Sequence, residues 1–378
     1  MTDPTPVRCP AITHPEAGLA DEGDFDPLLA RLAVPDAVRD AEVFPRGTMQ
    51  VDGRLDLCKQ GIGPVRTGRI VAAAVDSPLV RHLLLGTNGL GSDGARAVAD
   101  ALRPGHGLET VYLGCNRIDP AGVDALAGRI ESDETMRALW LKRNPIGDEG
   151  VARLARALAV NATIRTLDLV NVGMSGRGLA TLAEALAGRR QKLQRLFLGG
   201  NGFGPEVVPA LRTLVHDAGI RELYLAANHL GDTGAAALGA AIDGVPMTLG
   251  LGGNGLTPAG VAALARHLAA WQALDLARPP SERALGAHGN RVGDEGAAIL
   301  AGALPAARLR RLDVRRTEIG GRGARLLVAA LDGHPTLEYL GINGGVPRRM
   351  RRQAAALVAD RPATQPHPDI QAIASVYR

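Results

Sequence analysis

Apolar and polar positions repeat with a period of about 28 residues along most of the chain. Val80-x-x-Leu83-x-Leu85-x-x-Asn88-x-Leu90 is followed by the same frame from Leu108 and from Met136. The frame starts again at Ile164, Leu193, Ile220, Pro246, Trp271, Leu309 and Leu337, and a degenerate first copy ends in Leu55-Asp56-Leu57. One such unit is too small to bury its apolar side alone. We therefore expect about ten or eleven repeats to stack into a solenoid with one continuous core.

Each repeat is long enough for a short strand and a full helix. Val151, Leu154, Ala155 and Leu158 follow the spacing of one apolar helical stripe. Helix N-caps are expected at Ser92, Asp148, Asp232 and Asp294, and proline opens a helix after Asp119 and after Thr257. A glycine recurs six residues after the repeat asparagine, where a turn and a helix approach closely. The predicted class is α/β, a horseshoe-shaped solenoid with a parallel concave sheet and convex helices.

The frame L-x-x-L-x-L-x-x-N-x-L with a full helix per unit resembles the ribonuclease-inhibitor type of leucine-rich repeat. That class includes ribonuclease inhibitor, the Ran GTPase-activating protein and the repeat arms of NOD-like receptors. The resemblance covers residues from about Val51 to the C-terminus, and it implies a fold but no particular partner. Only three cysteines are present, so ribonuclease as the partner is not supported, and no catalytic motif of the Ran activator can be matched.

Composition indicates a protein of the cytoplasm. The chain has 378 residues, of which 46% are hydrophobic, and no apolar run approaches the length of a membrane span. Met1-Thr2-Asp3-Pro4 does not resemble the start of a secretion signal. Three distant cysteines argue against a disulfide framework. Arginine greatly outnumbers lysine, which we attribute to a GC-rich bacterial genome, and with a net charge of +4 we expect no nucleic-acid partner.

Three segments depart from the repeat and suggest a division into domains. Residues 1–50 are Pro-rich and acidic, and they form either a cap on the first repeat or a separate recruitment arm. Residues 51–346 form the solenoid, and residues 347–378 form a closing helix with a basic first turn, followed by a tail. Residues 278–288 are an insertion after a strand, before the frame resumes at Asn290. This insertion is either a neutral loop or a flap that brings Arg278, Glu282, Arg283 or His288 to a ligand.

One column of strand positions is rich in aromatic residues. Alternation along a strand should send this position out of the core, onto the concave face. The column reads Asp56, Leu84, Tyr112, Trp140, Asp168, Phe197, Tyr224, Gly250, Asp275, Asp313 and Gly341. Four rings in eleven positions are far more than chance supplies in a chain with only ten aromatic residues. The adjacent column is mostly glycine and alanine, so we expect a trough that binds an extended segment or a helix; the alternative is that the rings only pack against one another.

Charged residues on this face indicate what kind of partner it could bind. Asp168 between two rings should be partly desolvated and should attract a cation. The candidate binding residues are Tyr112, Trp140, Asp168, Phe197, Tyr224, Lys142, Arg143, Arg195 and Glu222. The hypothesis that follows is a non-catalytic scaffold for a protein or peptide partner, without a cofactor and of undetermined oligomeric state.

The alternative hypothesis is an enzyme or peptide-modifying factor. Asp275 and Asp313 should lie about 5 Å apart on adjacent strands, close enough to share a proton or to hold a metal. Arg315 could orient an anionic group beside them. Alternating Asp and Arg columns also form simple ion-pair ladders. Cys58, His82 and Cys115 occupy different frame positions, so we expect no metal site there, and no phosphate loop or zinc motif is present.

Overall fold

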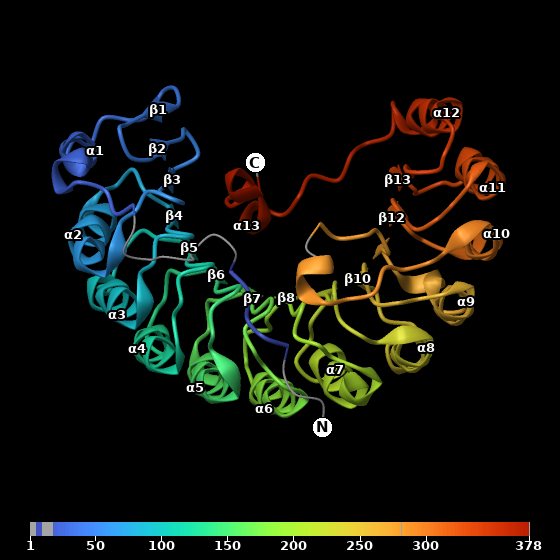
Figure 1. Ribbon diagram of the computed structural model, residues 1–378, viewed down its shortest axis with the longest axis horizontal. Coiled ribbons are helices and arrows are strands. Elements are labelled where there is room, and N and C mark those ends of the chain that lie inside the picture. Colours follow the sequence, from blue (N-terminus) through green and yellow to red (C-terminus); the bar gives the residue numbers. More distant parts are fainter. Residues whose placement is uncertain (1–4, 10–17, 281, 378) are drawn as a thin grey trace. The chain divides into compact units, whose positions relative to one another are not determined.

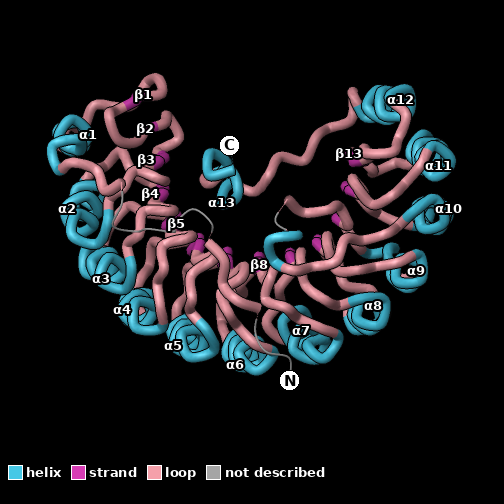
Figure 2. The backbone as a smooth tube through the Cα atoms, viewed as in Figure 1, coloured by secondary structure: helices cyan, strands magenta, loops and turns pink. Residues whose placement is uncertain are grey.

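The computed structural model describes residues 5–9, 18–280 and 282–377. Its contacts divide the chain into two units. The N-terminal unit comprises residues 6–193 and 366–378, and the C-terminal unit comprises residues 1–5 and 194–365. In each unit, short strands alternate with helices, and the helices line one side while the strands line the other (Figure 1; Figure 2).

The N-terminal unit contains five parallel strands, each followed along the chain by a helix. The strands are β3 (Arg54–Asp56), β4 (His82–Leu84), β5 (Thr110–Tyr112), β6 (Ala138–Trp140) and β7 (Thr166–Asp168). The helices are α2 (Gly63–Asp76), α3 (Gly91–Ala101), α4 (Pro120–Ile130), α5 (Gly147–Val160) and α6 (Gly176–Ala187). The middle residue of each strand enters the core, and Leu139 pairs with Val111 and Leu167 at full burial.

The C-terminal unit repeats the same arrangement with six parallel strands. They are β8 (Arg195–Phe197), β9 (Glu222–Tyr224), β10 (Thr248–Gly250), β11 (Ala273–Asp275), β12 (Arg311–Asp313) and β13 (Tyr339–Gly341). The helices are α7 (Val208–His216), α8 (Gly231–Ala241), α9 (Pro258–Ala265), α10 (Gly293–Ala303), α11 (Gly321–Asp332) and α12 (Arg348–Val358). In the described part of the chain, no helix has both the length and the apolar character that a membrane crossing requires.

Buried asparagines join many of the repeats to the next one. The Asn144 side-chain amide donates to the carbonyls of Leu113 and Leu141, at 3.0 and 2.9 Å. Its oxygen accepts from the backbone N–H groups of Asn116 and Ile118, at 2.9 and 3.1 Å. One side chain therefore satisfies backbone groups of two consecutive repeats that are buried away from water. We call the series of such residues the asparagine ladder.

The insertion leaves this ladder intact. The Asn290 amide donates to Leu251 and Leu276 at 2.9 Å each, although Leu276 lies 14 residues earlier in the chain. The Asn290 oxygen accepts from the N–H groups of Asn254 and Leu256 at 3.0 Å each. The inserted residues thus loop out between a strand and its own ladder asparagine.

The prediction that Ser92, Asp148, Asp232 and Asp294 are helix N-caps is wrong. Each of these residues is the second residue of its helix rather than the residue before it. The Asp232 carboxylate instead accepts from the Thr257 N–H at 2.8 Å and from the Thr257 hydroxyl at 2.5 Å, and so ties α8 to the start of α9. The expected helix starts at Pro120 and Pro258 are confirmed, and the Asp119 and Thr257 side chains accept from N–H groups of the following turn.

The recurrent glycine makes this tie between helices possible. A Cβ atom on Gly260 would lie 2.3 Å from Oδ1 of Asp232, and one on Gly178 would lie 2.3 Å from Oδ1 of Asp148. A side chain at either position would displace the carboxylate. The close approach expected at this glycine is therefore an approach of two neighbouring helices.

The N-terminal segment extends the sheet and also contacts the turns after the strands. β1 (Glu42–Val43) and β2 (Thr48–Met49) form an antiparallel hairpin that pairs with β3, and α1 (Asp26–Leu32) follows the turn η1 (Glu22–Phe25). The Arg8 N–H donates to the Asn171 side chain at 2.9 Å. Residues 42–49 add strands beyond the first repeat, as a cap would, and residues 10–17 lie outside the described residues. The division at residues 50 and 346 stays a prediction.

We expect Asn144→Ala to lower the free energy of unfolding by about 2–4 kcal/mol, because four hydrogen bonds of about 1 kcal/mol each are lost and backbone groups are left buried. Urea unfolding followed by circular dichroism measures the change. Asn343→Ala is the matched control: Asn343 is half-buried after β13, and its side-chain oxygen accepts no hydrogen bond from the described residues. Equal losses in the two variants would contradict the ladder's role.

Candidate protein-binding face

The strand register places the aromatic column as expected. Tyr112 pairs with Trp140 and Trp140 pairs with Asp168 in the N-terminal unit. Phe197 pairs with Tyr224 in the C-terminal unit, and Gly250 follows Tyr224 on the next strand. These residues flank the buried middle position of each strand, so their side chains leave the sheet on the face opposite the helices.

The expectation that all four rings are exposed is wrong for the N-terminal unit. Tyr112 is only 2% exposed and Trp140 only 1%. The glycine column explains the burial of Tyr112: a Cβ atom on Gly86 would lie 2.4 Å from its Cε1, and one on Gly114 would lie 2.6 Å from its hydroxyl oxygen. The ring lies flat over the two glycines and fills the space that we had expected to be an empty trough. The Lys142 ammonium lies 5.6 Å from the centre of the same ring.

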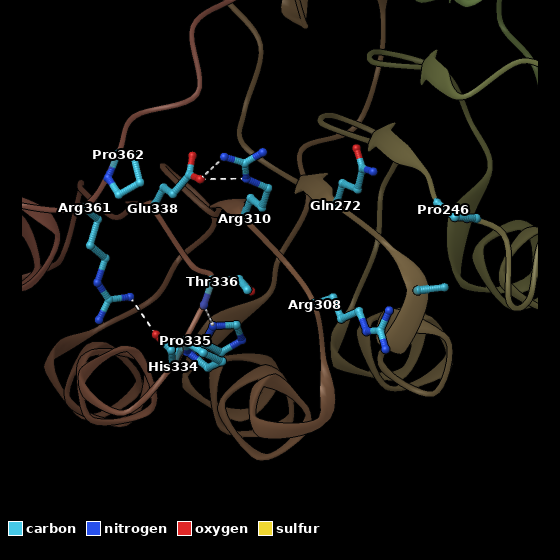
Figure 3. A pocket seen from close by; sticks show the side chains of 11 residues that line it. Pro246, Gln272, Arg308, Arg310, His334, Pro335, Thr336, Glu338, Arg361 and Pro362 are labelled. Carbon is cyan, nitrogen blue, oxygen red and sulfur yellow. Dashed lines mark hydrogen bonds and ion pairs between the residues drawn. The ribbon is translucent and has the colours of Figure 1, made fainter.

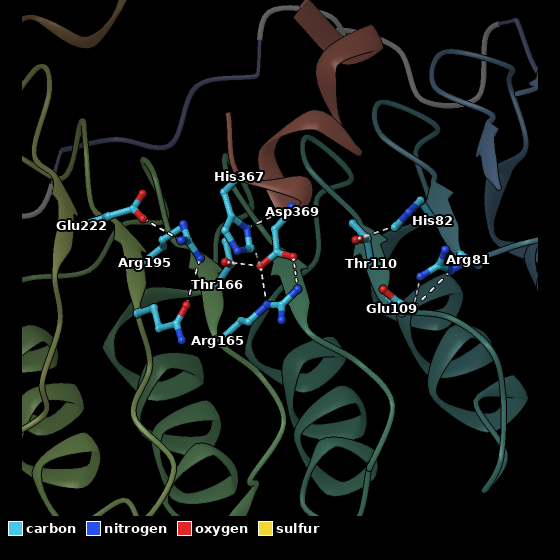
Figure 4. A network of polar contacts seen from close by, with 11 residues as sticks. Arg81, His82, Glu109, Thr110, Arg165, Thr166, Arg195, Glu222, His367 and Asp369 are labelled. Atoms are coloured by element: carbon cyan, nitrogen blue, oxygen red, sulfur yellow. Dashed lines mark hydrogen bonds and ion pairs between the residues drawn. The ribbon is translucent and has the colours of Figure 1, made fainter. Parts of the chain in front are cut away.

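Asp168 is also buried, with 1% of its surface exposed. Burial raises the pKa of Asp168 to about 6, although the nearby charges of Lys142 and Arg143 and a hydrogen bond from the Val170 N–H oppose the shift. The expected cations Lys142 and Arg143 are therefore close enough to act on this carboxylate. Arg195, another of the candidate binding residues, forms an ion pair with Glu222 at 2.6 Å (Figure 4).

The rings of the C-terminal unit form a stacked pair. The Phe197 and Tyr224 ring centres are 4.3 Å apart and the ring planes differ by 6°. Both residues are half-buried, so part of each ring is open to solvent. The Tyr224 hydroxyl donates to Glu222 at 3.1 Å. Glu222 in turn pairs with Arg195, so the polar groups beside the rings balance one another.

Asp275 and Asp313 lie on adjacent strands in direct register, as expected. They are not equivalent, however. Asp313 is bound by Arg315 at 2.6 Å and accepts from the Tyr339 hydroxyl at 3.3 Å. Asp275 is exposed and, among the described residues, accepts one hydrogen bond, from the Ala277 N–H at 2.8 Å. Partial desolvation by the surrounding protein and, after it, the charge of Asp313 raise the pKa of Asp275 to about 6.

The inserted loop packs on the turn that follows β10. The Gly255 N–H donates to the His288 carbonyl at 2.8 Å, and a Cβ atom on Gly253 would lie 3.1 Å from Pro279. Within the loop, Glu282 is buried and pairs with Arg278 at 3.0 Å, whereas Arg283 and His288 are exposed. A pocket of about 680 Å³ beside the loop is lined by Arg278, Glu282, His288, His229, Arg291 and Arg316, among others. Of the four predicted loop residues, Arg283 alone is absent from this lining.

A groove at the N-terminal ends of β10–β13 was not predicted. It has a volume of about 680 Å³ and is lined by Gln272, Arg308, Arg310 and Glu338, among others (Figure 3). The Arg310 Nε donates to Glu338 at 2.6 Å, and Arg361 donates to the His334 carbonyl at 2.9 Å. Arg310 and Glu338 are 28 residues apart, as are the paired Arg81 and Glu109. Opposite charges one period apart were the signal that could have revealed these pairs.

The C-terminal tail makes contacts that the sequence did not reveal. Residues of α13 (Pro368–Gln371) pack with the N-terminal unit, where the Asp369 carboxylate meets Arg165 and Thr166 (Figure 4). Partners separated by more than 200 residues in sequence follow no repeat period, so no spacing rule could have paired them. Among the described residues, no group of three or more His, Cys, Asp or Glu side chains could hold a metal.

Comparisons with known proteins support the repeat class. The family model described as Leucine Rich repeat matches residues 108–127, 132–155 and 220–239. A comparison with curated proteins found no match. A solved chain in the complex of Rad7 and Elc1 from yeast is similar with a TM-score of 0.52 and 16% identity, over 77% of this chain and 70% of that one. The actin-binding site 2 of leiomodin-1 gives a TM-score of 0.31 at 16% identity, over 47% of this chain and 85% of that one, which is too low to carry an argument. The expected α/β leucine-rich-repeat solenoid is confirmed.

We expect Asp168→Asn to stabilise the protein more at pH 7.5 than at pH 4.5. The folded-state pKa of about 6 lies above the unfolded value of about 3.9, so the folded state holds this proton more tightly. Ionisation of Asp168 therefore lowers the free energy of unfolding of the wild type by about 2 kcal/mol as pH rises from about 4 to 6. The Asn variant cannot ionise and does not lose this stability.

Urea unfolding of both proteins at the two pH values measures this difference. Asp56→Asn is the matched control, because Asp56 has the same frame position and also accepts the N–H two residues later, but is half-exposed. A stability gain by Asp168→Asn that is the same at both pH values would contradict the proposed burial cost.

Proposed function

We propose that this protein is a non-catalytic recognition scaffold that binds a protein segment on the strand face of β8–β13. The observation that carries the proposal is the stacked pair of Phe197 and Tyr224, which leaves part of each ring open to solvent. Rings held rigid by stacking offer contact area with little further loss of entropy on binding. We call this surface the β8–β13 face.

The charges on this face suggest the chemistry of the partner. Glu222 is neutralised by Arg195, and Asp313 is neutralised by Arg315. Asp275 is exposed and forms no ion pair with the described residues. It lies two strands from Tyr224 in the same column, or about 10 Å at the usual strand spacing. We therefore infer a partner segment with an aromatic or aliphatic side chain near the rings and a Lys or Arg near Asp275.

The buried rings have a different role in this proposal. Tyr112 and Trp140 pack within the N-terminal unit, and Lys142, Arg143 and Asp168 belong to the same packed region. We assign these five residues to the stability of the sheet. The repeat class supports a scaffold because stacked repeats present one extended surface, and the Rad7 and Elc1 structure is an example of a similar fold within a protein complex. We also propose the ribonuclease-inhibitor subtype and a bacterial, cytoplasmic origin.

A second candidate function is acid–base chemistry at Asp275 and Asp313. The pKa of Asp275, raised to about 6 by the surrounding protein and by Asp313, favours this candidate. The ion pair between Asp313 and Arg315 weighs against it, because Asp313 already has a cationic partner and need not share a proton. We therefore rank the scaffold first.

We expect the double variant Phe197→Ala/Tyr224→Ala to lose at least tenfold in affinity for the partner. Aromatic residues at the centre of an interface commonly contribute a large part of the binding energy. Quantitative mass spectrometry of proteins retained from lysate, with wild type and variant compared side by side, identifies the partner by its loss. Titration of that purified partner then gives the affinities.

Leu326→Ala is the matched control, because Leu326 is a large exposed apolar residue on helix α11 of the same unit. It should retain the partner at the wild-type level. The proposal is wrong if the double variant folds and retains the same proteins with unchanged affinity.

The two candidate functions respond differently to Asp275→Asn and Asp313→Asn. On the scaffold proposal, Asp275→Asn weakens partner binding severalfold, because an exposed ion pair contributes up to about 1 kcal/mol. Asp313→Asn has a smaller effect, since its charge is already neutralised by Arg315. If a reaction of the partner is detected and both variants abolish it while the ring variant reacts normally, acid–base chemistry is the function.

A further inference from the structure

The C-terminal tail contacts the N-terminal unit through the Asp369 carboxylate. Arg165 Nη2 donates to Asp369 Oδ1 at 2.8 Å, and Arg165 Nε donates to Asp369 Oδ2 at 3.1 Å. The Thr166 hydroxyl donates to the same Oδ2 at 2.6 Å. Two parallel bonds from one guanidinium form the fork that recognises carboxylates most specifically. In Figure 4, Arg165 and Thr166 extend from adjacent positions at the start of β7 toward Asp369.

The contact is shielded from water and has an apolar part. Asp369 is 3% exposed and Thr166 is fully buried. Ala372 and Ile373, just after the carboxylate, are 3% and 1% exposed. The Arg54 guanidinium also reaches the Gln371 carbonyl at 3.5 Å. The tail therefore presents one acidic and one aliphatic anchor within five residues, as a short peptide ligand does.

The residues before this anchor resemble a linker. Residues 362–366 are all exposed and form neither helix nor strand. Pro362 and Pro366 bound this stretch, and proline favours an extended, semi-rigid spacer. Within this stretch, the Thr364 N–H donates to Glu338 at 2.9 Å. A segment held by two anchors beyond this exposed contact can be released without disturbing the repeat that it covers. Release would leave the buried Thr166 hydroxyl and the Arg165 fork without their acceptor, so another carboxylate would be favoured there.

We propose that Arg165 and Thr166 form a binding site for short acidic segments of other proteins, and that the chain's own tail occupies this site as a tethered competitor. The preferred ligand carries Asp after Pro in a helical turn, with an aliphatic residue four positions later, as in Pro368-Asp369-Ile370-Gln371-Ala372-Ile373. The site uses none of the residues of the β8–β13 face, so it can exist whether or not that face binds a partner.

The test uses the full-length chain and a fluorescent peptide of residues 362–377. In the wild type, the tethered tail has a high effective concentration and should exclude the peptide. We expect full-length Asp369→Asn, whose own tail is weakened, to bind the peptide at least tenfold more tightly by fluorescence anisotropy. Addition of Arg165→Ala should remove this binding, and a peptide with Asn at position 369 should not bind.

Arg137→Ala is the matched control, because Arg137 has the same frame position on the preceding repeat and donates no side-chain hydrogen bond to the described tail. It should leave peptide affinity unchanged, as should Phe197→Ala/Tyr224→Ala. If Arg165→Ala does not fold, Arg165→Lys keeps the charge without the fork and should weaken binding at least severalfold.

Hydrogen exchange of the backbone amides of residues 370–376 reports whether the tail is released. We expect faster exchange in Asp369→Asn than in the wild type. Unchanged exchange would show that the tail is a fixed part of the fold and would overturn the proposal. Peptide binding that is absent in Asp369→Asn, or that survives Arg165→Ala, would overturn it equally.

Discussion

The asparagine ladder is the constraint on which the rest of the structure depends. Each turn after a strand leaves backbone N–H and C=O groups that have no strand partner, and one asparagine side chain satisfies them in two consecutive repeats. Because both its amide and its oxygen are used, the asparagine sits at the same place in each turn that carries it, and Val172 and Thr317 occupy this place in two other repeats. The insertion shows the strength of this requirement: the chain leaves after Leu276, and Asn290 still bonds to the carbonyl of Leu276.

A turn of constant geometry also keeps equivalent strand residues aligned in columns on the strand face. It does not determine how exposed the residues in a column are. Tyr112 lies flat because Gly86 and Gly114 leave room beside it, and it is buried as a result. Tyr224 stacks on Phe197 instead and stays half-exposed. One frame position therefore supplies a structural ring in one unit and a surface ring in the other. The neighbouring glycines account for the burial of Tyr112, because a position without a Cβ atom lets that ring lie against the sheet.

The periodic part of the structure could be predicted from the sequence, and the aperiodic part could not. Leu139, its partners and the ladder asparagines follow from a spacing that recurs in most repeats. The N-cap predictions failed at Asp232, because its helix begins one residue earlier and the neighbouring helix competes for its carboxylate. The pairing of Asp369 with Arg165 has no period at all, and only the folded chain brings them together. The stacking of the rings could be anticipated from their column, but their burial could not.

Four aspartates at one frame position show how the same local chemistry serves different ends. Asp56, Asp168, Asp275 and Asp313 each accept the N–H group two residues later, which shapes the end of the strand. Beyond that bond they differ. Asp168 is buried, and Asp313 is held by Arg315. Asp275 is exposed on the same strand face as Tyr224, so its second oxygen is available to a molecule from outside. A carboxylate whose local bond is satisfied and whose charge is not neutralised suits recognition of a basic residue, since binding a cation there disrupts no bond of the fold.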